Sequence, residues 1–178
     1  MQRGFFVRTY LHKNAGGGRS DPAFRVCACC VRGYAGFVAA PFRYQHRVTY
    51  AECTVGNHIY YARYLDLLEA ARGAFFRELG TSFLAWQERD VIFPALECRL
   101  RYKSPARYDD VLAIEVWPAC AERVRLNFAY RITNQTGALV LEAETLHACT
   151  GLNEKPKRLP EELVTRLAPY LRSATPDT

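Results

Sequence analysis

The 178-residue sequence has no uncharged apolar run of the roughly 18–20 residues that a membrane-spanning helix needs, so we expect no membrane span. Its seven cysteines are odd in number and mostly scattered singly, which excludes a disulfide framework. No second Cys or His pair stands at zinc spacing, so we predict no metal site. This cysteine pattern fits a reducing, cytoplasmic setting best.

Acidic residues are almost absent from the first forty positions. Residues 1–40 carry six basic side chains against Asp21 alone and so supply +5 of the net charge of +6. Residues 41–178 hold 18 basic and 17 acidic side chains, a net charge of +1. Because the remainder is nearly neutral, we expect no nucleic-acid binding.

Residues 1–40 also lack helical or strand periodicity, and they hold six of the eleven glycines. We interpret them as a basic extension that is disordered or that precedes the native start, with a targeting segment or real structure as the alternatives. Cys27, Cys29 and Cys30 would form only half of a metal site. Residues 173–178 are predicted to be a disordered tail.

From residue 41 the apolar pattern predicts an ordered domain. Residues 42–52 are predicted to form a strand and residues 60–79 a helix with an apolar stripe, followed by Gly80 at the position where a helix end favours glycine. The later predicted elements are strands over 92–102, 111–117, 123–133 and 138–149, a turn over 134–137, and a short helix over 160–171.

Short turns force neighbouring strands to be antiparallel, and the long helix must bury its stripe against the sheet. The predicted fold class is therefore α+β, with a curved antiparallel sheet wrapped around one long central helix. A chain of this length suits a single domain, which we place at residues 41–172.

The block over 50–65 joins the first predicted strand to the long helix. It contains Tyr50, Glu52, Thr54, Asn57, Tyr60, Tyr61, Arg63, Tyr64 and Leu65, followed by Glu69 and Arg72. In this spacing it resembles the opening block of the 4-hydroxybenzoyl-CoA thioesterase family, which includes the Tol-Pal-associated acyl-CoA thioesterases. Residues 101–110, 144–147 and 158–160 resemble later blocks of that family. The resemblance implies the hot-dog fold and hydrolysis of acyl-CoA thioesters to free acid and CoA, with no cofactor beyond the substrate's own CoA.

The sequence departs from the family pattern at the catalytic carboxylate. The family's second Asp is Thr54 here, its first Asp is Glu52, its glycine is Asn57 and its usual Asn is Arg63. Threonine has no accessible acid–base pKa, so it cannot act as the base.

The backbone N–H groups around residues 60–62 stand at the predicted helix start, where unpaired amides and the helix dipole favour a developing negative charge. In the family the oxyanion donor is the amide at the position of Tyr61, and the resemblance implies the same role here.

Glu69 is our candidate base. It follows Tyr61 by eight residues, close to two helical turns, so we expect both to border one cleft. Related hot-dog thioesterases carry a helix carboxylate at this spacing, and its burial would raise its pKa. The alternative is that Glu69 pairs with Arg72 at i+3.

Four other polar residues stand near the same junction, and each has a structural alternative. Glu52 could act directly or support the loop, and Thr54 could hydrogen-bond a water or the thioester oxygen. His58 could be a neutral base and Asn57 could position a water; otherwise Asn57 caps the helix and His58 is exposed. We interpret His147, on the last strand, as a packed residue.

Arg101, Lys103 and Arg107 are candidates for binding the phosphates of coenzyme A, with a solvated basic edge as the alternative. Because hot-dog subunits commonly pair, the resemblance also implies a homodimer or homotetramer. Two other functions remain open: a non-catalytic module that binds acyl-CoA or a partner protein, and a thioesterase that acts on an acyl-carrier-protein thioester.

Overall fold

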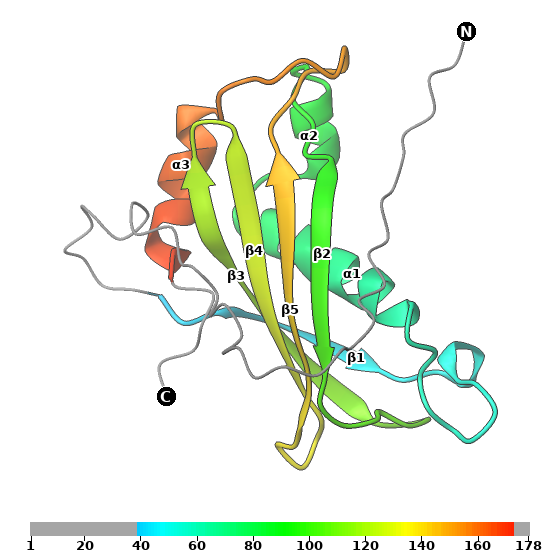
Figure 1. Ribbon diagram of the computed structural model, residues 1–178. Helices are drawn as coiled ribbons and strands as arrows, with labels where there is room; N and C mark the ends of the chain where they lie inside the picture. The colour runs from blue at the N-terminus through cyan, green and yellow to red at the C-terminus, as the bar shows by residue number, and fades with distance from the viewer. Residues whose placement is uncertain (1–38, 173–178) are drawn as a thin grey trace, which may run out of the picture.

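The computed structural model describes residues 39–172 of the chain, drawn in colour in Figure 1. The elements in chain order are β1 (Phe42–Arg47), η1 (Tyr50–Glu52), α1 (Arg63–Glu78), α2 (Phe83–Gln87), β2 (Ala95–Tyr102), β3 (Val111–Glu122), β4 (Arg125–Thr133), β5 (Leu139–Ala148), α3 (Glu161–Leu167) and η2 (Ala168–Tyr170). Within the described part of the chain, no helix is long and apolar enough to cross a membrane.

The ends of the chain lie outside this description. Most of the predicted extension over 1–40, with Cys27, Cys29 and Cys30, falls there, as does the predicted tail over 173–178. The proposed division of the chain therefore remains a prediction.

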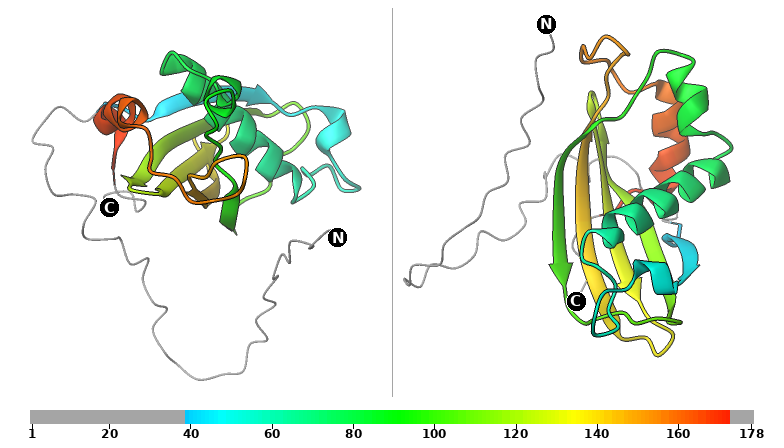
Figure 2. Two further views of the ribbon diagram at one scale, coloured as in Figure 1. Left: turned by 90° about the horizontal axis from the view of Figure 1, so that it is seen from above. Right: turned by 90° about the vertical axis from the view of Figure 1, so that its right-hand side faces the viewer.

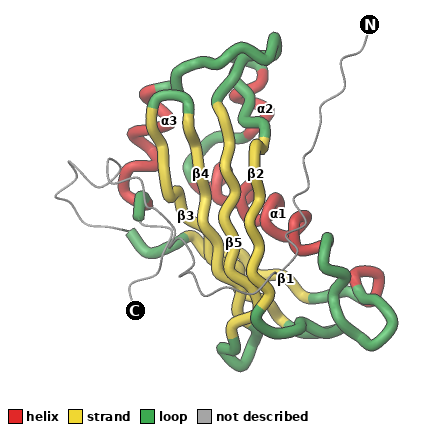
Figure 3. Tube along the Cα trace, in the orientation of Figure 1, coloured by secondary structure: helices red, strands yellow, loops and turns green. Residues whose placement is uncertain are grey.

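The strands form one antiparallel sheet in the order β1-β3-β4-β5-β2 (Figure 3). Strands β1 and β2 follow each other in the sequence but lie at opposite edges, because α1 and α2 carry the chain across one face of the sheet (Figure 2). The hairpin between β4 and β5 turns at Gly137, whose φ of +82° favours glycine. The Oδ1 atom of Asn134 accepts the Ala138 N–H at 2.9 Å, which confirms the predicted turn.

The core lies between α1 and the sheet face that it covers. Leu68, Ala71, Phe75 and Phe76 of α1 are at most 1% exposed. The inward residues of β4 alternate as the sequence predicts, and all are buried: Leu126, Phe128, Tyr130 and Ile132. The predicted α+β architecture is confirmed.

The structure differs from the sequence prediction at several local points. Strand β2 begins at Ala95 and not at residue 92, and β3 continues to Glu122 instead of ending at residue 117. The first strand ends at Arg47 rather than at Glu52, because Thr49 and Glu52 form a capping box that closes the turn η1. The long helix begins at Arg63 rather than at Tyr60, after a turn. The sequence pattern did not reveal α2, which starts where the Ser82 hydroxyl accepts the Ala85 N–H at 3.1 Å.

We expect Leu68→Ala, at a site that is 1% exposed, to lower the free energy of unfolding by about 2–5 kcal/mol, because it leaves a cavity under α1. The matched control, Leu84→Ala on α2, removes a side chain that is 62% exposed, and we expect a loss below about 1 kcal/mol. Chemical denaturation measures both. Equal losses would contradict this account of the core.

Candidate active site

The loop over 53–59 connects η1 to the turn before α1. It doubles back on itself, because Cys53 and Ile59 form a bridge and the Thr54 N–H donates to the His58 carbonyl at 2.8 Å. Its tip contains Gly56 and Asn57 at φ values of +95° and +59°. Glycine and asparagine are the residues that adopt this left-handed conformation most readily, so they suit the tight turn.

A second segment, over 104–110, holds this loop in place. The Ile59 N–H donates to the Ala106 carbonyl at 3.0 Å, and the Tyr108 N–H donates to Asn57 Oδ1 at 3.1 Å. The two blocks that carried the resemblance are therefore adjacent in space. Asn57 does not cap α1, whose N-cap is Ala62; it ties the two loops together.

The turn before α1 leaves two amide groups without acceptors. The Tyr60 N–H donates to the Glu52 carbonyl at 2.9 Å, and the Arg63 N–H donates to the Tyr60 carbonyl at 2.8 Å. The N–H groups of Tyr61 and Ala62 have no acceptor among residues 39–172. They stand at the positive end of the α1 dipole and can bind an oxyanion.

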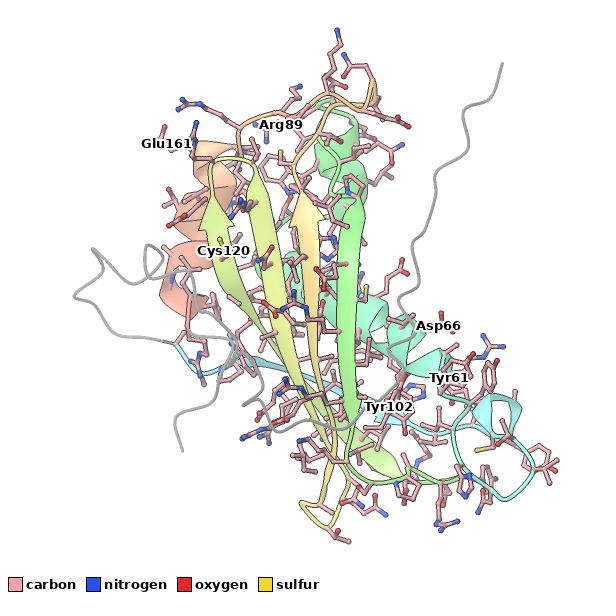
Figure 4. All side chains as sticks on the ribbon, viewed as in Figure 1. Tyr61, Asp66, Arg89, Tyr102, Cys120 and Glu161 are labelled. Carbon is pink, nitrogen blue, oxygen red and sulfur yellow. The ribbon has the colours of Figure 1, made fainter. Side chains whose placement is uncertain are left out.

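The turn is also fixed from the sheet. The hydroxyl of Tyr102, at the end of β2, donates to the Tyr61 carbonyl at 3.0 Å, and the two side chains lie close together in Figure 4. The ring of Tyr102 also packs edge-on against Tyr64 with centroids 5.4 Å apart. Tyr64 is 3% exposed and belongs to the core, whereas Tyr61 is 63% exposed.

Glu52 is fully engaged by its neighbours. Its carboxylate accepts the Thr49 N–H at 2.6 Å and the Thr49 hydroxyl at 2.8 Å, and it pairs with His46 Nε2 at 2.9 Å. Partial burial raises the pKa of this carboxyl, but the bonds from Thr49 and His46 outweigh burial and hold the pKa below its ordinary value. Glu52 lies in the turn η1 and not in the strand predicted over residues 42–52.

Thr54 and His58 are exposed. The Thr54 hydroxyl donates to the backbone carbonyls of Val55 at 3.3 Å and of His58 at 3.4 Å, and so stabilises the loop. The His58 side chain makes no hydrogen bond or ion pair with the rest of the described chain.

Glu69 is exposed on α1, and its carboxylate has no hydrogen-bond or ion-pair partner among residues 39–172. The alternative pairing with Arg72 is not formed, because Arg72 donates to the Tyr130 hydroxyl at 3.1 Å instead. The six steps along α1 from Arg63 to Glu69 span about 9 Å. Glu69 therefore stands well along the helix from the turn that carries the Tyr61 amide.

The candidate phosphate-binding residues are all exposed at the end of β2 and in the loop that follows. Lys103 forms an ion pair with Glu142 on β5 at 3.1 Å. Arg107 donates to the Gly56 carbonyl at 3.4 Å, so it lies against the 53–59 loop. Arg101 stands opposite Glu142 in the β2–β5 ladder. In the described part of the chain, no cluster of His, Cys, Asp and Glu could hold a metal ion.

Two features escaped the sequence analysis. One is that β2 is exposed along almost its whole length and has no strand partner on its outer side within residues 39–172. The other is a chain of hydrogen bonds under α1 that joins Tyr130, Thr145 and His147. His147 is only 2% exposed, which confirms that it is a packed strand residue. The only sequence signal for these hydrogen bonds was the presence of polar residues at inward positions of two strands.

An antiparallel sheet of this order wrapped around one long helix defines a hot-dog protein. The chain belongs to the thioesterase-like superfamily, whose family model matches residues 48–167. It is 34% identical over 124 residues to a protein named acyl-CoA thioester hydrolase YbgC from Escherichia coli O6:H1, a match that covers 69% of this chain and 92% of that protein.

Solved structures show the same fold. A hypothetical protein from Thermus thermophilus, TT1821, is similar with a TM-score of 0.67 at 30% identity, over 72% of this chain and 98% of that one. Slr0204 from Synechocystis, described as a 1,4-dihydroxy-2-naphthoyl-CoA thioesterase, also has a TM-score of 0.67, over 71% of this chain and 95% of its own. Its identity is 22%, so this likeness concerns the fold alone.

We expect Glu52→Gln to lower the free energy of unfolding by about 1–2 kcal/mol at neutral pH, because it weakens charge-assisted bonds to Thr49 and His46. A carboxyl whose folded pKa is depressed stabilises the fold above its ordinary pKa of 4.5 and loses that contribution as the pH falls through the lower folded value. The difference in the free energy of unfolding between Glu52→Gln and wild type, measured by denaturation, should therefore shrink as the pH falls from about 6 to about 3. Glu88→Gln, at an exposed carboxylate, is the control. A gap that did not depend on pH would contradict this role.

Proposed function

We propose that the protein hydrolyses acyl-CoA thioesters to free acid and CoA. The observation that carries the proposal is that the Tyr61 and Ala62 amides, at the start of α1, have no acceptor within residues 39–172, in a chain of the thioesterase-like superfamily. In thioester hydrolysis the carbonyl oxygen gains negative charge in the transition state. Two preorganised N–H donors at the positive end of a helix stabilise that charge more than they stabilise the neutral carbonyl.

The base is assigned by comparing the two candidate carboxylates. Glu52 accepts three hydrogen bonds that hold its pKa down, which makes it a weak base. Glu69 has no partner in the described chain, so its oxygens are available to a water molecule. Thr54 cannot accept the proton at all. Glu69 is therefore the proposed base, and Glu52, Thr54 and Asn57 hold the loop.

The proposed reaction follows from these roles. Glu69 removes a proton from water as the water oxygen attacks the carbonyl carbon, and the carbonyl electrons move to the oxygen held by the Tyr61 and Ala62 amides. When the C=O bond re-forms, the C–S bond breaks. The departing thiolate takes the proton from Glu69, which leaves a carboxylic acid and CoA.

The separation of Glu69 from the Tyr61 amide of its own chain points to a site shared between two copies. Strand β2 has an open, exposed edge, and α1 presents Glu69 outward. We infer that two copies pair along β2, so that Glu69 of one copy meets the turn over 60–62 of the other. A homodimer is then the smallest active unit.

Coenzyme A is expected to lie near the 104–110 segment. Arg107 contacts the 53–59 loop and so is the basic residue best placed for a phosphate. Lys103 would have to exchange its ion pair with Glu142, and Arg101 is the remaining candidate. The acyl-carrier-protein thioester and the non-catalytic module remain the alternative functions, and the predicted cytoplasmic setting belongs to the same proposal.

We expect Glu69→Gln to reduce kcat for acyl-CoA hydrolysis by about 10²–10⁴-fold, because a positioned general base contributes that much. Release of free thiol from a panel of acyl-CoA substrates measures the rate. Glu78→Gln, an exposed glutamate on the same helix, should stay within a few-fold of wild type.

Each alternative function has its own outcome in this assay. Wild type that binds CoA but hydrolyses neither acyl-CoA nor acyl-carrier substrates would establish the non-catalytic module. Hydrolysis of the acyl-carrier-protein thioester alone would establish that the protein is a thioesterase for carrier-bound substrates. Full activity in Glu69→Gln would remove Glu69 from the mechanism.

A shared site predicts complementation between inactive variants. Tyr61→Pro removes one oxyanion amide, and Glu69→Gln removes the base. Random pairing of the two variants after unfolding and refolding should restore about a quarter of the wild-type activity, since half the dimers then contain one intact site of two. The double variant mixed with itself is the control and should stay inactive. No recovery, with circular dichroism showing both variants folded, would place the whole site in one chain.

A further inference from the structure

A row of polar side chains lies buried beneath α1, away from the residues assigned to the reaction. Tyr130 on β4 and Thr145 and His147 on β5 are each 2% exposed. The Tyr130 hydroxyl lies 3.2 Å from Thr145 Oγ1, and Thr145 Oγ1 lies 2.9 Å from His147 Nε2. At one end of the row, His147 Nδ1 is 3.1 Å from the Phe93 carbonyl. At the other end, Arg72 on α1 reaches the Tyr130 hydroxyl at 3.1 Å.

The direction of every bond in this chain follows from its two ends. A carbonyl can only accept, so His147 Nδ1 carries the proton and donates to Phe93. Burial, together with the nearby Arg72 cation, lowers the pKa of His147 to about 4, so at neutral pH Nε2 is unprotonated and accepts from the Thr145 hydroxyl. The Thr145 oxygen then accepts from Tyr130, whose own oxygen accepts from Arg72.

Arg72 is therefore held by a row of hydrogen bonds in which the hydroxyls of Tyr130 and Thr145 each donate one bond and accept another. Its guanidinium carbon also lies 5.7 Å from the ring centre of Phe83 and 6.0 Å from that of Phe128, within range of a cation–π attraction. Within residues 39–172 no carboxylate forms an ion pair with it. Yet Glu69 stands three residues earlier on the same helix, the spacing at which Glu and Arg commonly pair.

We propose that Tyr130, supported by Thr145 and His147, is a positioning residue that holds Arg72 against the sheet and thereby keeps the Glu69 carboxylate unpaired. The proposal rests on the proposed role of Glu69 as the base. An ion pair with Arg72 would occupy the oxygens of Glu69 and lower its pKa, and both effects weaken a base.

The titratable groups around Arg72 support this role. The charge of Arg72 acts to lower the pKa of three nearby groups: Cys98 on β2, Tyr130 on β4 and His147 on β5. Burial raises the pKa of Cys98 and of Tyr130 and lowers that of His147, so each is neutral near pH 7. Arg72 is the only charged member of this set of four, and Glu69 is the carboxylate next to it along the helix. The Tyr130 hydroxyl, as the acceptor on the sheet, therefore holds the Arg72 guanidinium away from Glu69.

The direct measurement is the pKa of Glu69, read from the side-chain carboxyl carbon of ¹³C-glutamate-labelled protein and assigned by its loss in Glu69→Gln. Tyr130→Phe removes the acceptor with little change in volume, so Arg72 becomes available to Glu69. We expect the pKa of Glu69 to fall by about 0.3–1 pH unit, and the acidic limb of kcat/KM to move down with it.

A double-variant cycle separates this effect from general disruption. Adding Arg72→Met to Tyr130→Phe removes the cation, so the pKa of Glu69 should rise again, to the wild-type value or above it. Arg72→Met alone should not lower the Glu69 pKa, because removal of a nearby cation can only raise the pKa of a carboxyl. If Tyr130→Phe does not fold, Thr145→Val tests the same chain from the far side of Tyr130, with a smaller shift in the same direction.

An unchanged Glu69 pKa in Tyr130→Phe, or one that stays low after Arg72 is also removed, overturns the proposal. Because the titration does not depend on catalysis, its result is distinguishable from failure of the proposed function, which full activity of Glu69→Gln would show. If the Glu69 pKa shifts in Tyr130→Phe but Glu69→Gln is fully active, then Tyr130 positions Arg72 without any effect on catalysis.

Discussion

The packing of α1 on the sheet fixes both ends of the candidate site. Leu68, Ala71, Phe75 and Phe76 are almost completely removed from water, at a gain of roughly 1.5–3 kcal/mol for each large side chain, so the helix has little freedom to rotate or slide. Its start is then held beside the 104–110 segment, where the Tyr61 and Ala62 amides have no acceptor in the part of the chain that the structure describes. Its outer side carries Glu69, while Arg72 reaches down to the sheet.

Local patterns predicted the fold because each element obeys one strong rule. The apolar stripe of α1, the alternation along β4 and the Asn134 turn were all visible in the sequence, and the structure confirms them. The failures came where side chains bond the backbone or pair over a distance. The capping box of η1 replaces the last residues of a predicted strand, and the Arg72–Tyr130 bond joins residues 58 positions apart. No periodicity encodes such a contact.

The two candidate carboxylates, Glu52 and Glu69, have very different surroundings. Glu52 stands nearest the family's acidic motif, yet its three hydrogen bonds stabilise the ionised form and commit its oxygens to the loop. Glu69 is on the solvent side of a helix, and its carboxylate has no hydrogen-bond or ion-pair partner within the described residues. Glu52 is the acidic residue nearest to Thr54 in the sequence, but the place of Glu69 on the predicted helix already favoured Glu69, and the hydrogen bonds to Glu52 agree with that preference.

Threonine at position 54 is compatible with hydrolysis only if the two tasks of the site are physically separable. Backbone amides stabilise an oxyanion whatever side chains surround them, so the turn over 60–62 keeps that capacity when its neighbours change. Proton transfer needs a specific side chain, but that side chain can come from any element that reaches the reacting atoms. In the mechanism proposed here that side chain is Glu69 of a second copy, so assembly and catalysis become one requirement.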